Sequence, residues 1–258
     1  MRCGPSKEKD RLASFAASAQ LRETGVALLR EFFPKVALTR LREAAVGCFQ
    51  SICIGGSIPE RYRFNPLSNS VLLTALLEFG CETNDDLLAP LSAELEGLFT
   101  EAMKRPWRCN LGQSWVRKKF APAHAPDSAY HLQNWHQDGA LGARFPLQPG
   151  PVIPMTELLT CWIPLHDCGI DSPGLEFVRR RTRALLHFTE LSDAALRGRF
   201  AEDEFWAPAL DFGDGLIFLN DVLHRTHVHS GMQDDRLSVE YRIFPQEENT
   251  FPLEADSG

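Results

Sequence analysis

The sequence predicts a mainly β fold with flanking helices, of the sandwich or jelly-roll type. From Trp107 onward, short β-prone runs alternate with Gly, Pro and Asp, a pattern typical of many short strands joined by turns. Long helical patterns do not alternate with these runs, which argues against a parallel sheet of strand–helix–strand units. The first 105 residues, by contrast, have mostly helical periodicity.

The individual elements follow from local signals. The apolar run Gly25–Phe33 predicts a short strand in its first half, and Pro34 then opens a helix. Further helices are expected over Ser70–Phe79 and Asp85–Met103. The predicted strands are Trp115–Phe120, Ala129–His136, Glu157–Leu165, Gly174–Arg179, Ala184–Phe188, Gly215–Leu219, Val222–His229 and Arg236–Phe244.

These elements predict a single domain over residues 1–258. A mostly helical surround is expected at 1–105, a β core at 106–246 and a loose acidic tail at 247–258. No Gly-, Pro- or Ser-rich linker divides the chain, so we expect the helices to pack on the outside of the β unit.

Composition excludes several classes of function. The net charge of −7 argues against nucleic-acid binding driven by bulk electrostatics. No apolar run approaches the roughly 20 residues of a membrane span, and the first ten residues lack the apolar core of a signal peptide. The seven cysteines are scattered without a C-x-x-C pair, which favours a reducing, cytoplasmic location. The expected partner is a small-molecule substrate, and the oligomeric state is not predicted.

The first chemical signal is His136-Gln137-Asp138, followed by Gly139. Residues two apart on a strand point to the same side, so the imidazole and the carboxylate can converge on one point. Gly139 then lets the chain turn away.

The second signal is the group His224, His227 and His229, in a β-rich segment after a predicted turn and strand. Two imidazoles and one carboxylate that leave coordination positions open are the ligand set of non-haem Fe(II) oxygenases. The same set also occurs in catalytic zinc sites. His227 and His229 lie an odd number of residues from His224, so an unbroken strand points them to the opposite side unless a bulge intervenes.

The third signal is Arg236-Leu237-Ser238, on the strand that follows His224. A 2-oxo acid that chelates iron needs a cation for its distal carboxylate. Arginine offers a bidentate fork, and the Ser238 hydroxyl points to the same side of the strand. Arg242, also on that side, is an alternative anchor.

Together, these motifs resemble the phytanoyl-CoA dioxygenase family of iron(II)/2-oxoglutarate oxygenases, over about Glu23 to Phe244. Trp135-His136-Gln137-Asp138 matches its iron-binding W-H-Q-D, and Gly213–Phe218 up to His224 resembles its G-D-x-L-x-F…H run. Thr24–Leu29, Leu159–Leu165 and Pro173–Val178 are similar to other family segments. Arg179–Arg183, with four arginines in five residues, departs from the family's usual P-G-S-H.

The resemblance implies a double-stranded β-helix (a cupin-like jelly roll) with helices outside. It implies Fe(II) bound by His136, Asp138 and His224, and 2-oxoglutarate bound by Arg236 with Ser238. Thr160, on a predicted central strand, is a further candidate donor to the 2-oxo acid. The reaction it implies consumes O2, releases succinate and CO2, and hydroxylates a small or medium organic metabolite.

Other interpretations remain at this point. The fold also suits a zinc hydrolase, although hydrolases do not need the Arg-x-Ser anchor, or a non-catalytic β-barrel that binds a metal or ligand. The Arg179–Arg183 run is either a solvated loop or a grip for an acidic substrate group. Arg117, Lys118 and Lys119 form a basic strand, one of whose side chains could meet 2-oxoglutarate or substrate.

Overall fold

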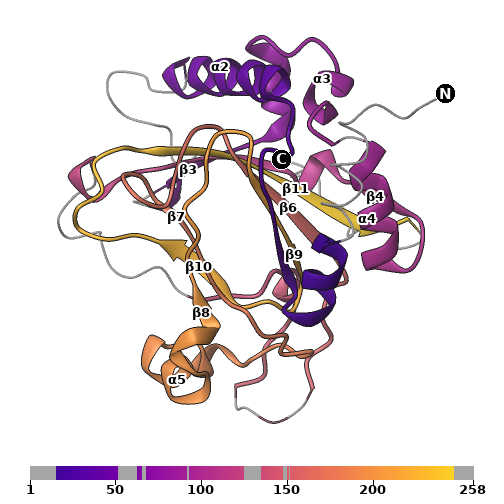
Figure 1. The fold of residues 1–258 in the computed structure, drawn as a ribbon, viewed down its shortest axis with the longest axis vertical. Helices are drawn as coiled ribbons and strands as arrows, with labels where there is room; N and C mark the ends of the chain where they lie inside the picture. The colour runs from indigo at the N-terminus through magenta and orange to yellow at the C-terminus, as the bar shows by residue number, and fades with distance from the viewer. Residues whose placement is uncertain are drawn as a thin grey trace, which may run out of the picture.

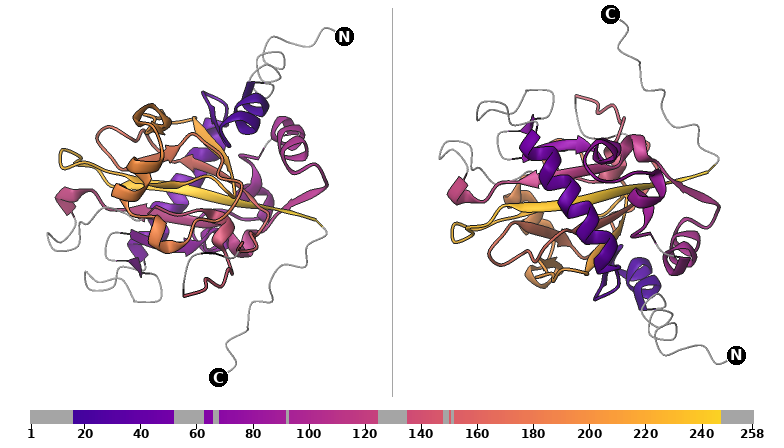
Figure 2. Two further views of the ribbon diagram at one scale, coloured as in Figure 1. Left: turned by 90° about the horizontal axis from the view of Figure 1, so that it is seen from below. Right: turned by 90° about the horizontal axis from the view of Figure 1, so that it is seen from above.

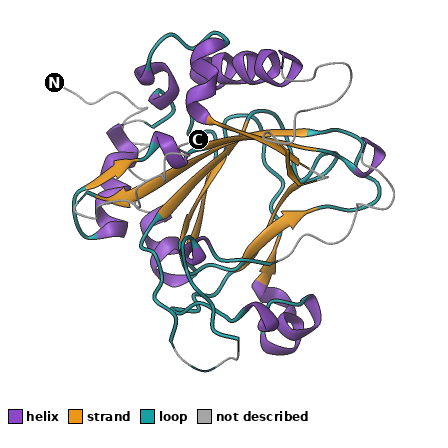
Figure 3. Ribbon diagram, turned by 180° about the vertical axis from the view of Figure 1, so that it is seen from behind, coloured by secondary structure: helices purple, strands orange, loops and turns teal. Residues whose placement is uncertain are grey.

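Two antiparallel sheets face each other, with helices on the outside (Figures 1 and 3). The computed structural model describes residues 16–51, 63–65, 68–91, 93–124, 135–147, 150 and 152–246. The large sheet has the order β1-β9-β6-β11-β5-β3-β2, with β4 beside β11, and the small sheet has the order β10-β7-β8. This arrangement is the predicted double-stranded β-helix.

The large sheet draws strands from both halves of the chain. Three precede residue 106, which divides the expected helical surround from the β core: β1 (Val26–Leu29), β2 (Arg63–Asn65) and β3 (Ser68–Leu72). The later ones are β4 (Trp107–Cys109), β5 (Trp115–Lys119), β6 (Leu159–Pro164), β9 (Gly215–Leu219) and β11 (Arg236–Pro245). The small sheet consists of β7 (Gly174–Val178), β8 (Phe205–Trp206) and β10 (His224–His227). The sheet therefore recruits strands from a region whose periodicity is mostly helical.

The helices cover the outer faces of both sheets. After Pro34, α2 (Lys35–Ser51) lies across the large sheet, as Figure 2 shows, and its Leu38 and Leu41 belong to the same buried core cluster as the outward side chains of β11. A short helix, α5 (Asp193–Arg199), packs Leu196 on the small sheet. None of the helices in the described ranges has the length and apolar character that crossing a membrane requires.

The predicted strand Ala184–Phe188 is not a strand in the structure, and two predicted helices also differ from the observed elements. Ser70–Phe79 begins instead as β3, which pairs with β5, and continues as a 3₁₀ helix over Leu73–Glu78. The predicted helix Asp85–Met103 is divided into α3 (Asn84–Leu88) and α4 (Ala93–Met103). In both cases tertiary pairing and packing override a local helical pattern.

The cysteines in the described residues are all free thiols. Burial raises the pKa of Cys48 and Cys109 to about 11 and that of Cys168 to about 12. These thiols are therefore protonated at neutral pH and pack as small apolar groups.

The arginine-rich loop after β7 is tied to the fold. Arg181 donates from Nε to both oxygens of the fully buried Asp221, at 3.1 and 3.0 Å, and the backbone N–H of Arg183 donates to the same carboxylate at 2.9 Å. Arg179 lies over Trp206, and Arg180 pairs with Glu204. These contacts assign a structural role to most of the run.

Replacing Asp221 by alanine should lower the free energy of unfolding by about 3 kcal/mol, because a buried ion pair loses one partner. Asp203→Ala is the matched control: Asp203 is exposed, so its loss should change stability by less than about 0.5 kcal/mol. Urea denaturation of both variants measures the difference, and equal losses would contradict the structural role of this loop.

Candidate functional site

The two predicted histidine ligands are joined through their backbones. The N–H of His136 donates to the carbonyl of His224, and the N–H of His224 donates to the carbonyl of His136, both at 3.0 Å. This antiparallel bridge extends the small sheet by one short segment beyond β10. It brings the two imidazole rings to 4.2 Å between centroids. Most of the predicted strand Ala129–His136 lies outside the described residues.

Asp138 completes the group where the chain turns into a 3₁₀ turn, Asp138–Ala140. Its Oδ1 lies 3.7 Å from Nε2 of His224, and one ligand atom from each of His136, Asp138 and His224 lies within 4.8 Å of the others. The turn requires glycine at position 139, because an added Cβ would lie 2.3 Å from Met155 Cγ and 2.9 Å from the carbonyl of Asn220. The three groups are therefore close enough to share one metal ion.

Of the three candidate distal histidines, His224 is the one that lies beside His136 and Asp138. In the described part of the chain, the cluster of possible ligands holds neither His227 nor His229. Their rings lie 6.1 Å from each other; His227 is half-buried and His229 is exposed. The odd spacing from His224 indicated this separation.

The ring of His224 is held in one orientation. Its Nδ1 lies 3.0 Å from the carbonyl of Val222, which can only accept, so Nδ1 carries the proton and Nε2 faces Asp138. Phe177 stacks on the ring at 5.8 Å and Phe218 lies at 4.6 Å. Such outer contacts fix the tautomer of a metal-binding imidazole.

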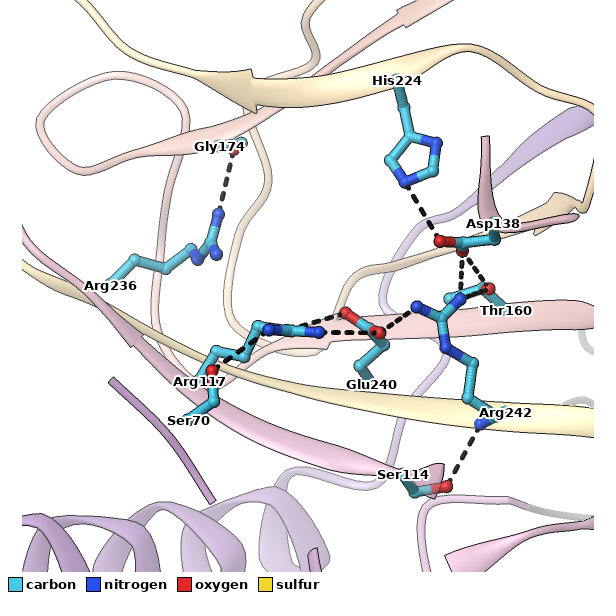
Figure 4. A network of polar contacts seen from close by, with 10 residues as sticks. All are labelled: Ser70, Ser114, Arg117, Asp138, Thr160, Gly174, His224, Arg236, Glu240 and Arg242. Carbon is cyan, nitrogen blue, oxygen red and sulfur yellow. Dashed lines mark hydrogen bonds and ion pairs between the residues drawn. The ribbon is translucent and has the colours of Figure 1, made fainter. Parts of the chain in front are cut away.

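The other oxygen of Asp138 is bound by side chains from two strands of the large sheet (Figure 4). The hydroxyl of Thr160 donates to Oδ2 at 2.6 Å, and Nη1 of Arg242 donates to the same oxygen. Burial alone would raise the pKa of Asp138, but the Arg242 guanidinium and the His224 ring hold it well below its usual range. Oδ1 is thereby left to face the histidines.

A chain of alternating charges continues from Arg242 through the barrel interior, as Figure 4 shows. Glu240 accepts from Arg242 and, at 3.2 Å, from Nε of Arg117, whose Nη1 donates to Ser70 Oγ at 3.1 Å. Burial opposes ionisation of Glu240, but the two arginines lower its pKa overall. The sequence predicted Arg242 as an alternative anchor for the 2-oxo acid. In the structure its guanidinium instead contacts two carboxylates, those of Asp138 and Glu240.

Arg236 and Ser238 lie on the same inner face of β11. Arg236 is 3% exposed; its Nη1 donates to the carbonyl of Gly174 at 3.0 Å, and its guanidinium lies 5.0 Å from the centre of the Trp162 ring. The buried Ser238 Oγ has no hydrogen-bond partner within the described ranges. A buried hydroxyl left in this way is a position where a ligand atom fits.

The metal-ligand cluster and Arg236 line one cavity of about 110 Å³. Its wall combines the charged groups above with apolar side chains, among them Trp162, Leu175 and Phe218. Pockets for drug-sized ligands are roughly 300–1,000 Å³, so this space suits a small organic acid beside an ion.

The structure thus brings His136, Asp138, His224 and Arg236 to one cavity, whereas the fully buried Ser238 is not among the residues that line it. Thr160, predicted to donate to the 2-oxo acid, uses its hydroxyl on Asp138; its contact with the acid stays a prediction. Sequence reasoning missed Glu240. The signal for it was present, because Arg236, Ser238, Glu240 and Arg242 are each two residues apart and so share one face of a strand.

We compared the chain with known protein families, curated proteins and solved structures, and solved structures alone gave matches. No family model matches the sequence, and no curated protein matches it. Among solved structures, AviO1 from Streptomyces viridochromogenes Tue57 is similar over 93% of this chain and 98% of its own, with 18% identity and a TM-score of 0.63. SnoN, a non-haem α-ketoglutarate-dependent epimerase from nogalamycin biosynthesis, is similar over 91% and 84%, with 15% identity and a TM-score of 0.61.

A third similar structure is EctD from S. alaskensis with 2-oxoglutarate and 5-hydroxyectoine. It covers 88% of this chain and 74% of its own, with 13% identity and a TM-score of 0.62. At such identities the likeness establishes the fold. The chain has the double-stranded β-helix fold of these enzymes.

Proposed function

We propose that the protein is an Fe(II)- and 2-oxoglutarate-dependent dioxygenase that hydroxylates a small or medium organic metabolite. The observation that carries this proposal is the cluster His136, Asp138 and His224, whose ligand atoms lie within 4.8 Å of one another on a cavity shared with Arg236. The order of the motifs along the sequence supports membership of the phytanoyl-CoA dioxygenase family.

The donor set fits iron. Two neutral imidazoles and one carboxylate on one side of an ion leave positions for a bidentate 2-oxo acid and O2. The buried Ser238 hydroxyl and the Arg236 guanidinium fit the distal carboxylate of 2-oxoglutarate. The chemistry supplied at such a centre is oxidation of a C–H bond, coupled to release of succinate and CO2.

The chain's own residues prepare the centre for this chemistry. Arg242 and Thr160 fix Asp138 so that one oxygen is presented, and Val222 fixes the His224 ring. Trp162 and Phe218 exclude water from the cavity wall, which strengthens the electrostatic contacts within it.

Asp138 keeps the full carboxylate ligand, which argues against halogenation, because a halide would need the coordination position that the carboxylate occupies. Similar structures include a carbocyclase, SnoK, as well as the epimerase SnoN, so the product depends on how a substrate is held. The small-molecule class of substrate is supported by neighbours such as SnoN in complex with nogalamycin RO.

Anaerobic titration of the metal-free protein with Fe(II), and then with 2-oxoglutarate, tests the centre. A visible charge-transfer band should appear when the 2-oxo acid chelates the iron. His224→Ala should abolish the band, whereas His227→Ala, on the same strand but outside the cluster, should keep it. A band of equal strength in both variants would refute the ligand assignment. No band in the wild-type protein at full iron loading would refute the proposed function.

Arg236→Leu should raise the dissociation constant for 2-oxoglutarate at least about tenfold, because a buried charge-assisted contact contributes about 1.5–3 kcal/mol. Iron affinity should change little. The control is Arg180→Leu, whose side chain is 60% exposed and pairs with Glu204. Equilibrium titration of the Fe(II)-loaded variants measures both constants. If Arg236→Leu bound 2-oxoglutarate as Arg180→Leu does, the anchor would lie elsewhere.

A further inference from the structure

The segments that carry the two histidine ligands also have large buried side chains on the side away from the cavity. On β10 the side chain of His224 lines the cavity, so that of its neighbour Arg225 lies on the opposite face of the sheet. His136 lines the cavity as well, whereas the preceding Trp135 packs in a cluster with Leu196 of α5. Each histidine is thus adjacent in sequence to a side chain outside the barrel.

One carboxylate contacts both of these outer side chains. Asp193 is the first residue of α5, and its Oδ1 accepts a hydrogen bond from Nε1 of Trp135 at 3.2 Å. Nη1 of Arg225 lies 2.8 Å from the same oxygen, and the Arg225 guanidinium lies 4.5 Å from the centre of the Trp135 ring. The three side chains therefore contact one another and join the segment of His136 to that of His224.

Arg225 and Trp135 depend on this carboxylate because both are buried. Arg225 is 6% exposed and Trp135 is 2% exposed. Glu176, which is paired with Arg225 between β7 and β10, accepts from its Nε at 2.6 Å. Loss of Asp193 would remove a carboxylate from Arg225 and the acceptor from the indole N–H. A buried donor without a partner is costly, so both side chains would shift to find new partners.

We propose that Asp193 is a positioning residue of the metal centre. It holds Trp135 and Arg225 together from outside the barrel and so fixes the separation of His136 and His224 before an ion binds. This inference rests on the proposed function, because it concerns the ion which that function requires. Asp193 touches neither the ion nor the substrate and acts only through the two neighbours of the ligands.

The proposal has a reciprocal consequence for α5. Groups that orient metal ligands from outside typically change metal affinity by about 10- to 100-fold. If the docked helix raises the affinity for the ion by some factor, the bound ion must stabilise the docked helix by the same factor. Ion binding inside the barrel is therefore measurable as slower opening of a helix on its outer surface.

Anaerobic calorimetric titration with Fe(II) tests the first effect. Asp193→Ala should raise the dissociation constant for Fe(II) at least about tenfold. Glu202→Ala is the matched control, because Glu202 also pairs with Arg197 of α5, at 2.8 Å, but is 83% exposed; it should stay within about twofold of wild type. Equal dissociation constants in the two variants would overturn the proposal.

A double-mutant cycle separates positioning from a general loss of stability. Arg225→Met should weaken Fe(II) as well, because it removes the charge that Asp193 holds. If the two residues act through one contact, the double variant should bind Fe(II) no more weakly than the weaker single variant. Losses that simply add would overturn a joint role.

Hydrogen exchange of the wild-type protein needs no variant and decides the question even if the variants do not fold. Saturating Fe(II) should slow exchange of the backbone amides of α5 at least about tenfold more than those of α3. The comparison is with another short helix, since α3 packs against β11 through the carbonyl of Leu87, which accepts from Tyr241. Equal slowing in the two helices would overturn the coupling.

The two proposals fail in different ways. A wild-type protein that binds no Fe(II) overturns the proposed function, and this inference with it. A wild type that binds Fe(II) with His224 but independently of Asp193 overturns only the role of α5.

Discussion

The buried carboxylate of Asp138 is the constraint on which the barrel interior depends. An anion in this position costs free energy unless a cation accompanies it, and Arg242 is that cation. Arg242 is itself enclosed and needs Glu240, which in turn needs Arg117. Each charge in this series therefore offsets the one before it, and the series ends at Arg117, which is partly exposed.

This series also explains why the two sides of the barrel differ. The strands around β11 present polar and charged side chains to the interior. The facing sheet and β9 present apolar ones, including Leu175, Phe177 and Phe218. The charged side chains around β11 can thus orient a polar ligand, while the apolar side chains of the facing sheet and β9 keep water away from it. Such a division suits a site in which charged groups fix position and apolar groups control access of water.

The parts of the site that sequence reasoning predicted are those encoded in short motifs. His136-x-Asp138 and Arg236-x-Ser238 depend only on the period of a strand, and the separation of His224 from His227 follows from the same rule. The fold class followed from the run of short strands after Trp107. The resemblance of several segments to a known family added the ligand set.

The parts that were missed depend on pairing between distant strands. The spacing along β11 places Glu240 on the inner face, but its pairing with Arg117 and the contact of Arg242 with Asp138 depend on the register of β11 with β5 and β6. Ser70–Phe79 carries a helical pattern, yet its first residues become β3 because β5 offers a partner. Pairing of this kind is set by the whole fold and cannot be read from a local window.

The reciprocal backbone bonds between His136 and His224 link segments that are far apart in the chain. Closing so long a loop costs conformational entropy that the folded barrel must offset. An ion held by these residues would bind the closed barrel and not the unfolded chain, so it would stabilise the fold by mass action. An ion bound between these two segments would therefore slow the opening of the barrel as well as stabilise it.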